Sequence, residues 1–281
     1  MGQNKPITDE HYIPRCYLKQ FTIDSERLYQ YDVISRKQTP VPVHINSICY
    51  ERNLYEFKDE NGEFIYRNLI EKSFIPYEGI FADVFRSIQA KATNKANLAT
   101  RSFLTMKEKA FLMIFLTTMI LRAPETLHEL SETTKDIYNR NISDTTAKNL
   151  VLQTGLPIYK ELDFKETSLF NAVLGLFEDM AFIIGITEQD SLLTSDKPVL
   201  VKGETNPVKV LDVILPITPN LILFMKPYAN TNRELYNRLR IWDKKNIEAA
   251  NKKMLRQCHR WIYSKSLLTE QQIKWISKLR K

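Results

Sequence analysis

The spacing of hydrophobic residues changes twice along this chain, and this change limits the fold more than any other feature. Between residues 27 and 66, short stretches are rich in β-branched and aromatic residues with partial alternation, which favours strands. Between residues 67 and 180, apolar residues recur every three or four positions, which favours helices. From 181 to 225, short apolar runs return, separated by Asp, Pro, Asn and Gly. Strands, then helices, then strands predict an α+β fold rather than a doubly wound sheet.

The expected elements follow this pattern. Thr105 and Glu108 form a capping-box pattern before an apolar helix, and Pro76 is expected to kink or split the helix before it. Helices are expected at 67–92, 105–122, 124–153, 167–180, 232–255 and 269–280. Strands are expected at 27–33, 38–45 (irregular or at an edge), 54–57, 64–66 after an Asn-Gly turn, 181–186, 192–194, 208–210, 213–217, 221–225 and 259–264. These elements predict one α+β domain over residues 1–281, with N-terminal short strands, a central helical bundle and a mostly antiparallel C-terminal sheet packed by a long basic helix.

The longest apolar run is too short to cross a membrane. It covers residues 110–121, contains two threonines and is flanked by Lys109 and Arg122, whereas a spanning helix needs about 20 apolar residues. The first six residues contain no apolar segment of the kind found in signal peptides. Three scattered cysteines, an odd number, suit reduced thiols. We therefore expect a cytoplasmic protein without membrane association.

Positive charge is concentrated in the last fifth of the chain. Residues 226–281 contain 15 Lys or Arg and four Asp or Glu, while residues 1–225 contain 25 and 29. In the expected helix at 232–255, an apolar stripe that includes Asn246 faces the sheet, and basic residues such as Lys244 and Lys252 surround the stripe. This basic face is either solvated or follows the phosphates of a nucleic acid, in which case Lys244 and Lys252 bind substrate.

Common catalytic and nucleotide-binding motifs are absent from the sequence. It contains no G-x-x-x-x-G-K-[ST], G-x-G-x-x-G, G-x-S-x-G, H-E-x-x-H or C-x-x-C pattern, and only seven glycines. The sequence therefore argues against Gly-rich phosphate loops and against serine hydrolases with a nucleophile elbow.

The first candidate site residue is His11, just ahead of Pro14. Pro14 suits the first position of a short helix, with Tyr17 on its apolar face and Arg15 on the other side. The His11 imidazole titrates near neutral pH and is able to act as a general acid or base. Alternatively, His11 caps the helix or binds a backbone carbonyl, and Tyr17 belongs to the core.

The second candidate is Asp196, which follows an expected strand and precedes Pro198. Such a stretch is first of all a turn, in which Ser and Asp side chains bind nearby backbone N–H groups. A carboxylate held rigidly at the end of a strand is also suited to bind a metal or to orient His11. Asn251 points away from the apolar stripe of the basic helix and is able to join Asp196 in a polar site.

Two weaker patterns concern metals. Asp32 with Glu56 and Lys58 fits carboxylates on neighbouring strands that bind Mg²⁺, with a lysine that polarises a phosphate. Glu-x-Lys triplets also arise by chance in a chain rich in both residues. The five-residue separations between His and Cys, at 11 and 16 and at 44 and 49, do not fit the shorter gaps usual for zinc. We therefore assign no metal ligand, and a divalent cation such as Mg²⁺ enters only as the cofactor that a hydrolase would need.

Several stretches resemble an uncharacterised bacterial family of unknown function. They are His-x-x-Pro-x-x-Tyr-Leu-x-x-Phe at 11–21, Thr-Ser-Asp-Lys-Pro-Val at 194–199, Leu-Pro-Ile-Thr-Pro-Asn at 215–220, and Asn251 ten residues before Trp-Ile-Tyr-Ser at 261–264. The stretches occur in order from about His11 to Ser264, so the resemblance implies family membership over nearly the whole chain. One departure is Lys197, where we expect Asn in the family. The resemblance implies no activity.

Two functional hypotheses follow. In the first, the chain is a phosphodiester hydrolase, a nuclease-like effector, with His11 as acid–base group, Asp196 as its orienter or a metal ligand, and Arg15, Tyr17 and Asn251 in substrate binding. In the second, the chain is not an enzyme, the basic C-terminal region binds nucleic acid or an acidic partner, and the His11 motif is architectural. A scaffold without a ligand is a third interpretation, and the oligomeric state is not predicted.

Overall fold

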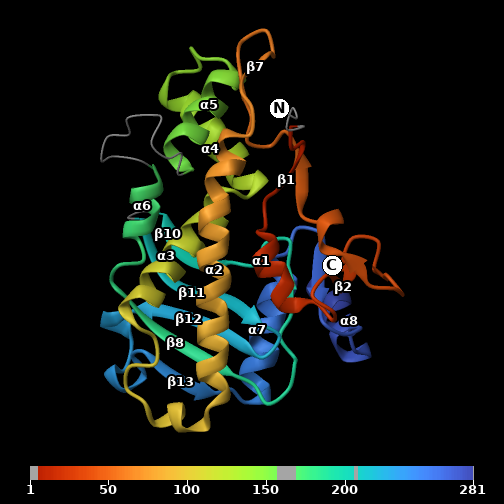
Figure 1. Cartoon of the computed structure of the whole chain (residues 1–281), viewed down its shortest axis with the longest axis vertical. Helices are drawn as coiled ribbons and strands as arrows, with labels where there is room; N and C mark the ends of the chain where they lie inside the picture. Colours follow the sequence, from red (N-terminus) through yellow and green to blue (C-terminus); the bar gives the residue numbers. More distant parts are fainter. Residues whose placement is uncertain (1–5, 157–168, 206–207, 281) are drawn as a thin grey trace, which may run out of the picture.

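A five-stranded sheet occupies the lower half of the molecule as drawn in Figure 1. In the computed structural model, which describes residues 6–156, 169–205 and 208–280, its strands lie in the order β10-β11-β12-β8-β13. Their bounds are β8 Met180–Ile186, β10 Leu200–Thr205, β11 Val208–Thr218, β12 Leu221–Pro227 and β13 Arg238–Ile241. Neighbouring strands are antiparallel except β13, which runs parallel to β8. The expected mostly antiparallel C-terminal sheet is confirmed.

Helices cover both faces of this sheet because successive residues of a strand point to opposite sides. On β11, Val213 packs in the core shared with α2 (Leu69–Thr93) and α3 (Met106–Leu121). Its neighbour Ile214 packs in a second core with α7 (Lys244–Gln257). Figure 1 shows α2 crossing one face of the sheet, with α7 behind it. The architecture is therefore helices, sheet, helices, with α2 and α3 on one side and α7 on the other, where Ile276 of α8 joins the same core.

The central helices begin where local sequence signals predict. The Thr105 Oγ1 accepts the Glu108 N–H at 3.2 Å, and a Glu108 carboxylate oxygen accepts the Thr105 N–H at 2.7 Å, so the capping box before α3 is confirmed. Pro76 lies inside α2, which continues through it as a single helix of 25 residues. Pro76 is the eighth residue of α2, beyond the first turn, so it removes the one intrahelical bond to the Lys72 carbonyl while the rest of the helix keeps its bonds.

The polar segment after α3 forms two helices, so the single helix expected at 124–153 is wrong. The structure has α4 at Pro124–Ile137 and α5 at Asp144–Gly155. Asn139 and Arg140 between them have positive φ, a backbone conformation that a helix does not allow. α6 covers Leu169–Gly175, and the first two residues of the helix expected at 167–180 lie outside the described residues.

A smaller sheet joins distant parts of the chain. Its central strand β2 (Arg27–Asp32) pairs with β14 (Trp261–Ser264), and β14 pairs with β9 (Thr194–Ser195). The last strand thus connects the N-terminal strand β2 to the chain around β9. The remaining elements are β1 Asp9–His11 paired with β5 Tyr50–Arg52, β3 Lys37–Gln38 and β4 Val43–His44 paired with β2, β6 Phe57–Lys58 paired with β7 Phe64–Tyr66, and the helices α1 Arg15–Leu18 and α8 Glu270–Leu279.

The basic helix is shorter than expected. Residues 232–243 form a 3₁₀ turn at Arg233–Leu235 and then strand β13, so the helix expected at 232–255 is wrong over its first half. Asp243 caps α7 by accepting the Asn246 N–H at 2.8 Å, and the Asn246 side chain is exposed rather than buried. β13 forms because β8 offers it an open edge, a tertiary contact that overrides local helix propensity.

Two further details differ from the expected strands. The strand expected at 54–57 is replaced by β5 before it and β6 at its end, and β10 was not expected.

Of the helices in the described ranges, none by itself is long and apolar enough to cross a membrane; α3 and α4 reach that length and apolarity only as a pair bent by 70°.

Candidate functional site

Tyr17 connects the N-terminal helix to two distant strands. Its hydroxyl lies 2.7 Å from Thr194 Oγ1 and donates to the Pro216 carbonyl at 2.8 Å. The side chain is fully buried, and burial raises the pKa of the phenol. Three of the stretches that carry the family resemblance therefore meet at one hydroxyl, and this position gives Tyr17 a structural role in the core.

Asp196 holds the start of β14. Its Oδ1 accepts the His259 N–H at 2.8 Å, and its Oδ2 accepts the N–H groups of Arg260 and Trp261 at 2.6 and 2.8 Å. Burial raises the pKa of this carboxyl, and the three N–H groups oppose that rise. A carboxylate has about four acceptor positions, so three are used by the backbone and one remains for another donor.

Asn251 binds the backbone on the other side of β9. Its Oδ1 accepts the Leu193 N–H at 3.0 Å, and its Nδ2 donates to the Ser191 carbonyl at 2.8 Å. Asn251 thus fixes the chain just before β9, and Asp196 fixes the chain just after it. Both side chains are buried, and these bonds satisfy polar groups that would otherwise be costly to bury.

His11 lies in a different environment from Asp196. Its Nε2 has no hydrogen-bond partner, and its ring lies 5.7 Å from the ring of Tyr50. Burial, and then the charges of Arg15 and Arg122, lower the pKa of the imidazole to about 4. The imidazole is therefore neutral near pH 7. The structure does not bring His11 and Asp196 together, and the catalytic roles assigned to them stay predictions.

The residues considered for Mg²⁺ are engaged in other contacts. An oxygen of Asp32 accepts from Arg260 Nη2 at 2.7 Å, and Glu56 accepts the Asn68 N–H at 3.0 Å. Within the described ranges, no group of three or more His, Cys, Asp or Glu residues is arranged to hold a metal ion.

Asp196 lines a cavity of about 210 Å³ together with Tyr12, the neighbour of His11. We call it the Tyr12 cavity. The end of α3 and the start of α4 complete the wall with apolar or small side chains, and Lys197 adds an ammonium group. The cavity is lined by Tyr12, Ile13, Met119, Ile120, Ala123, Thr126, Asp196, Lys197, Pro198, Val199, Val201 and Gln257. Residues from two of the stretches that carry the family resemblance thus face one space.

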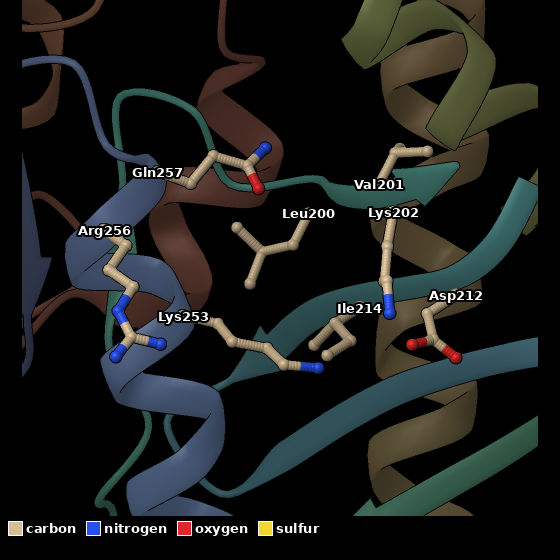
Figure 2. A pocket seen from close by; sticks show the side chains of 8 residues that line it. All are labelled: Leu200, Val201, Lys202, Asp212, Ile214, Lys253, Arg256 and Gln257. Carbon is tan, nitrogen blue, oxygen red and sulfur yellow. The ribbon is translucent and has the colours of Figure 1, made fainter. Parts of the chain in front are cut away.

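A second hollow, of about 280 Å³, lies between α7 and strands β10 and β11 (Figure 2). We call it the basic hollow. Lys253 and Arg256 approach it from α7 and Lys202 from β10, while Leu200 and Ile214 lie between them (Figure 2). All three cationic side chains belong to exposed residues. The hollow therefore presents three positive charges and one carboxylate, that of Asp212, around an apolar floor.

The two cavities adjoin. Val201 and Gln257 belong to the walls of both. The Gln257 Nε2 donates to the Val199 carbonyl at 3.1 Å, which holds this side chain in place between them. Gln257, the last residue of α7, thus lies between the basic hollow and the Tyr12 cavity.

The other expected binding residues lie elsewhere. Lys244 lines a larger groove of about 690 Å³ on the α8 side of α7. The Lys252 Nζ lies 3.4 Å from a Glu248 carboxylate oxygen and 4.6 Å from the centre of the Trp275 ring. The Arg15 side chain is exposed and its Nη1 donates to Asn46 Oδ1 at 3.2 Å. These residues do not share a cavity with Asp196.

Sequence reasoning missed the basic hollow because it missed β10. Lys253 and Arg256 are three positions apart and so lie on one side of a helix, a spacing that the sequence does show. Lys202 joins them only through the pairing of β10 with β11, which local sequence does not reveal. The charge count therefore indicates the basic C-terminal region but not the basic hollow within which Lys202 joins Lys253 and Arg256.

A family model described as "Protein of unknown function (DUF4238)" matches residues 10–267. No curated protein and no solved structure matches the chain. The matched range contains the four stretches that carry the resemblance and all residues that line the Tyr12 cavity and the basic hollow.

Proposed function

The chain belongs to the DUF4238 family of proteins of unknown function, and we propose that it is a non-enzymatic module that binds the phosphate groups of nucleic acid in the basic hollow. The observation that carries this proposal is the convergence of Lys202, Lys253 and Arg256 on one hollow.

These three cations lack carboxylate partners among the described residues, none of which forms an ion pair with them. Asp212 is the one carboxylate among the residues that line the hollow, and it pairs with Lys226 at 3.8 Å. Three cations and this one carboxylate line the hollow, so an anion entering it would meet a net positive charge. An arginine also binds phosphate oxygens with two parallel N–H groups, and lysines add point charges.

The floor of the hollow strengthens this preference. Leu200 and Ile214 are buried apolar residues that exclude water from one side of the bound group. Charges interact more strongly beside an apolar surface than in bulk water, because the effective dielectric constant is lower there.

The hydrolase hypothesis receives less support from the geometry. His11 is buried, with a pKa of about 4, and Asp196 uses most of its acceptor capacity on the backbone. A general base for phosphodiester cleavage needs hydrogen-bond access to the attacking water. Binding by the basic hollow needs no such group, so we favour the binding module.

The test is the salt dependence of binding to a fluorescein-labelled 12-nucleotide single strand, measured by fluorescence anisotropy between 50 and 200 mM NaCl. The triple variant Lys202→Gln, Lys253→Gln, Arg256→Gln removes the three cations. For single strands each neutralised phosphate contributes about 0.7 to the slope of log K against log salt, so the slope should decrease in magnitude by about 2.

A matched variant removes three cations elsewhere on the basic C-terminal region: Lys245→Gln, Lys274→Gln, Lys278→Gln. These residues are exposed and do not line the basic hollow. The proposal predicts that this control keeps a slope close to that of the wild type. Equal losses in the two variants would show diffuse charge attraction instead, and no binding by the wild type would refute nucleic-acid binding altogether.

A further inference from the structure

The Tyr12 cavity combines an aromatic residue with polar and charged ones. Tyr12 and aliphatic residues of α3 line it together with Thr126, Asp196, Lys197 and Gln257. Asp196 keeps one acceptor position beside its three bonds to the backbone, and the ammonium group of Lys197 only donates.

This chemistry matches a nucleobase. A base has flat apolar faces that stack on an aromatic ring, and an edge that carries both donors and acceptors. Toward such an edge the Asp196 carboxylate would accept and the Lys197 ammonium group would donate. The volume of about 210 Å³ lies below the range of about 300 to 1,000 Å³ typical of pockets for drug-sized molecules, which suits one base rather than two.

We infer that the Tyr12 cavity holds one unstacked base of the nucleic acid whose adjacent phosphate lies in the basic hollow, so that the ligand is single-stranded. This inference rests on the proposed function and names the form of nucleic acid that the same site selects. The shared wall of Val201 and Gln257 provides the connection, since a base and its own phosphate are close neighbours along a strand.

A base paired in a duplex is stacked on both faces and cannot enter a cavity of this size without being extruded. The site should therefore prefer single strands over duplexes. It should also distinguish a normal single strand from one that has the same phosphates and sugars but no bases.

The experiment compares three fluorescein-labelled 12-mers at one salt concentration: a single strand, its duplex, and an abasic strand of equal length. The wild-type chain should bind the single strand at least tenfold more tightly than either of the others. Ala123→Phe places a ring in the Tyr12 cavity and should reduce the affinity for the single strand to that for the abasic strand.

Ala90→Phe is the matched control, because Ala90 is an exposed residue of α2 outside both cavities. It should bind all three strands like the wild type. If thermal unfolding shows that Ala123→Phe is not folded, Thr126→Phe from the next turn of the same wall replaces it, and the wild-type comparison of normal and abasic strands needs no variant.

Equal affinity of the wild type for the normal and the abasic strand would overturn the base-binding inference while leaving phosphate binding intact. Tighter binding to the duplex would overturn it as well. If no strand binds at all, the proposed function and this inference both fall.

Discussion

Glu10 and His11 are neighbours in the chain, yet burial shifts their pKa values in opposite directions, and this gives a sharp test of the structure. Burial raises the pKa of the Glu10 carboxyl from 4.5 to about 7, and nearby Glu56 and Glu71 add to this rise against the hydrogen bond from the Tyr55 N–H. Burial lowers the pKa of the His11 imidazole from 6.5 to about 4. Both groups therefore prefer to be neutral in the folded protein.

The sign of each effect on stability follows from proton linkage. The folded state holds the Glu10 proton more tightly than the unfolded state, so Glu10 lowers the free energy of unfolding as pH rises from 4.5 to 7. The unfolded state holds the His11 proton more tightly, so His11 lowers the free energy of unfolding as pH falls from 6.5 to 4. At about 1.4 kcal/mol per pH unit, each contribution is about 3 kcal/mol. In the wild type the two nearly cancel between pH 4.5 and 6.5.

Single substitutions should reveal the pH dependence of the unfolding free energy that each group contributes and that nearly cancels in the wild type. Urea unfolding followed by tryptophan fluorescence, from pH 4 to pH 8, gives the difference in unfolding free energy between variant and wild type. The unfolding free energy of Glu10→Gln relative to the wild type should increase by about 3 kcal/mol as pH increases from 4.5 to 7. That of His11→Gln relative to the wild type should increase by about 3 kcal/mol as pH decreases from 6.5 to 4. Differences that do not vary with pH would refute the burial of both groups.

Three further substitutions test the packing around the site by the midpoint of urea unfolding. Tyr17→Phe leaves two buried partners unsatisfied and should destabilise the fold by about 2 kcal/mol; no change would show that these bonds are not formed. Asp196→Asn weakens three bonds to the backbone and should cost about 3 kcal/mol, and an unchanged midpoint would contradict its role in holding β14. In Gly185→Ala the new methyl group would lie 2.5 Å from Trp242 Nε1, so we expect a loss of about 1–3 kcal/mol, and a stabilised variant would contradict the packing of the indole.

The parts of the fold that the sequence predicts are those with local causes. The capping box at Thr105, the Asn61-Gly62 turn and the final helix after Thr269 each depend on residues within a few positions of one another. β13 has no such cause. Its sequence alternates arginine and aliphatic residues and becomes a strand only because β8 lies beside it.

The candidate site likewise combines features that depend on neighbouring residues with features that depend on distant ones. The turn predicted around Asp196 includes one expected local bond: Ser195 Oγ accepts the N–H of Lys197, two residues further on, at 3.1 Å. The Asp196 carboxylate itself binds N–H groups more than sixty residues away, which no local pattern reveals. The pairing of His11 with Asp196 was expected from their chemistry alone, and the chain places Tyr12 on the wall of the Asp196 cavity instead.

The central claim is that phosphate binds in the basic hollow, and the most direct measurement is a crystal structure of the chain with a short single strand that carries 5-bromouracil. Anomalous scattering then locates the bromine independently of the protein density. The account predicts a phosphate within hydrogen-bond distance of Lys253 and Arg256, and the bromine at the Tyr12 cavity. A strand bound in the groove beside Lys244, with the basic hollow free of phosphate, would contradict it.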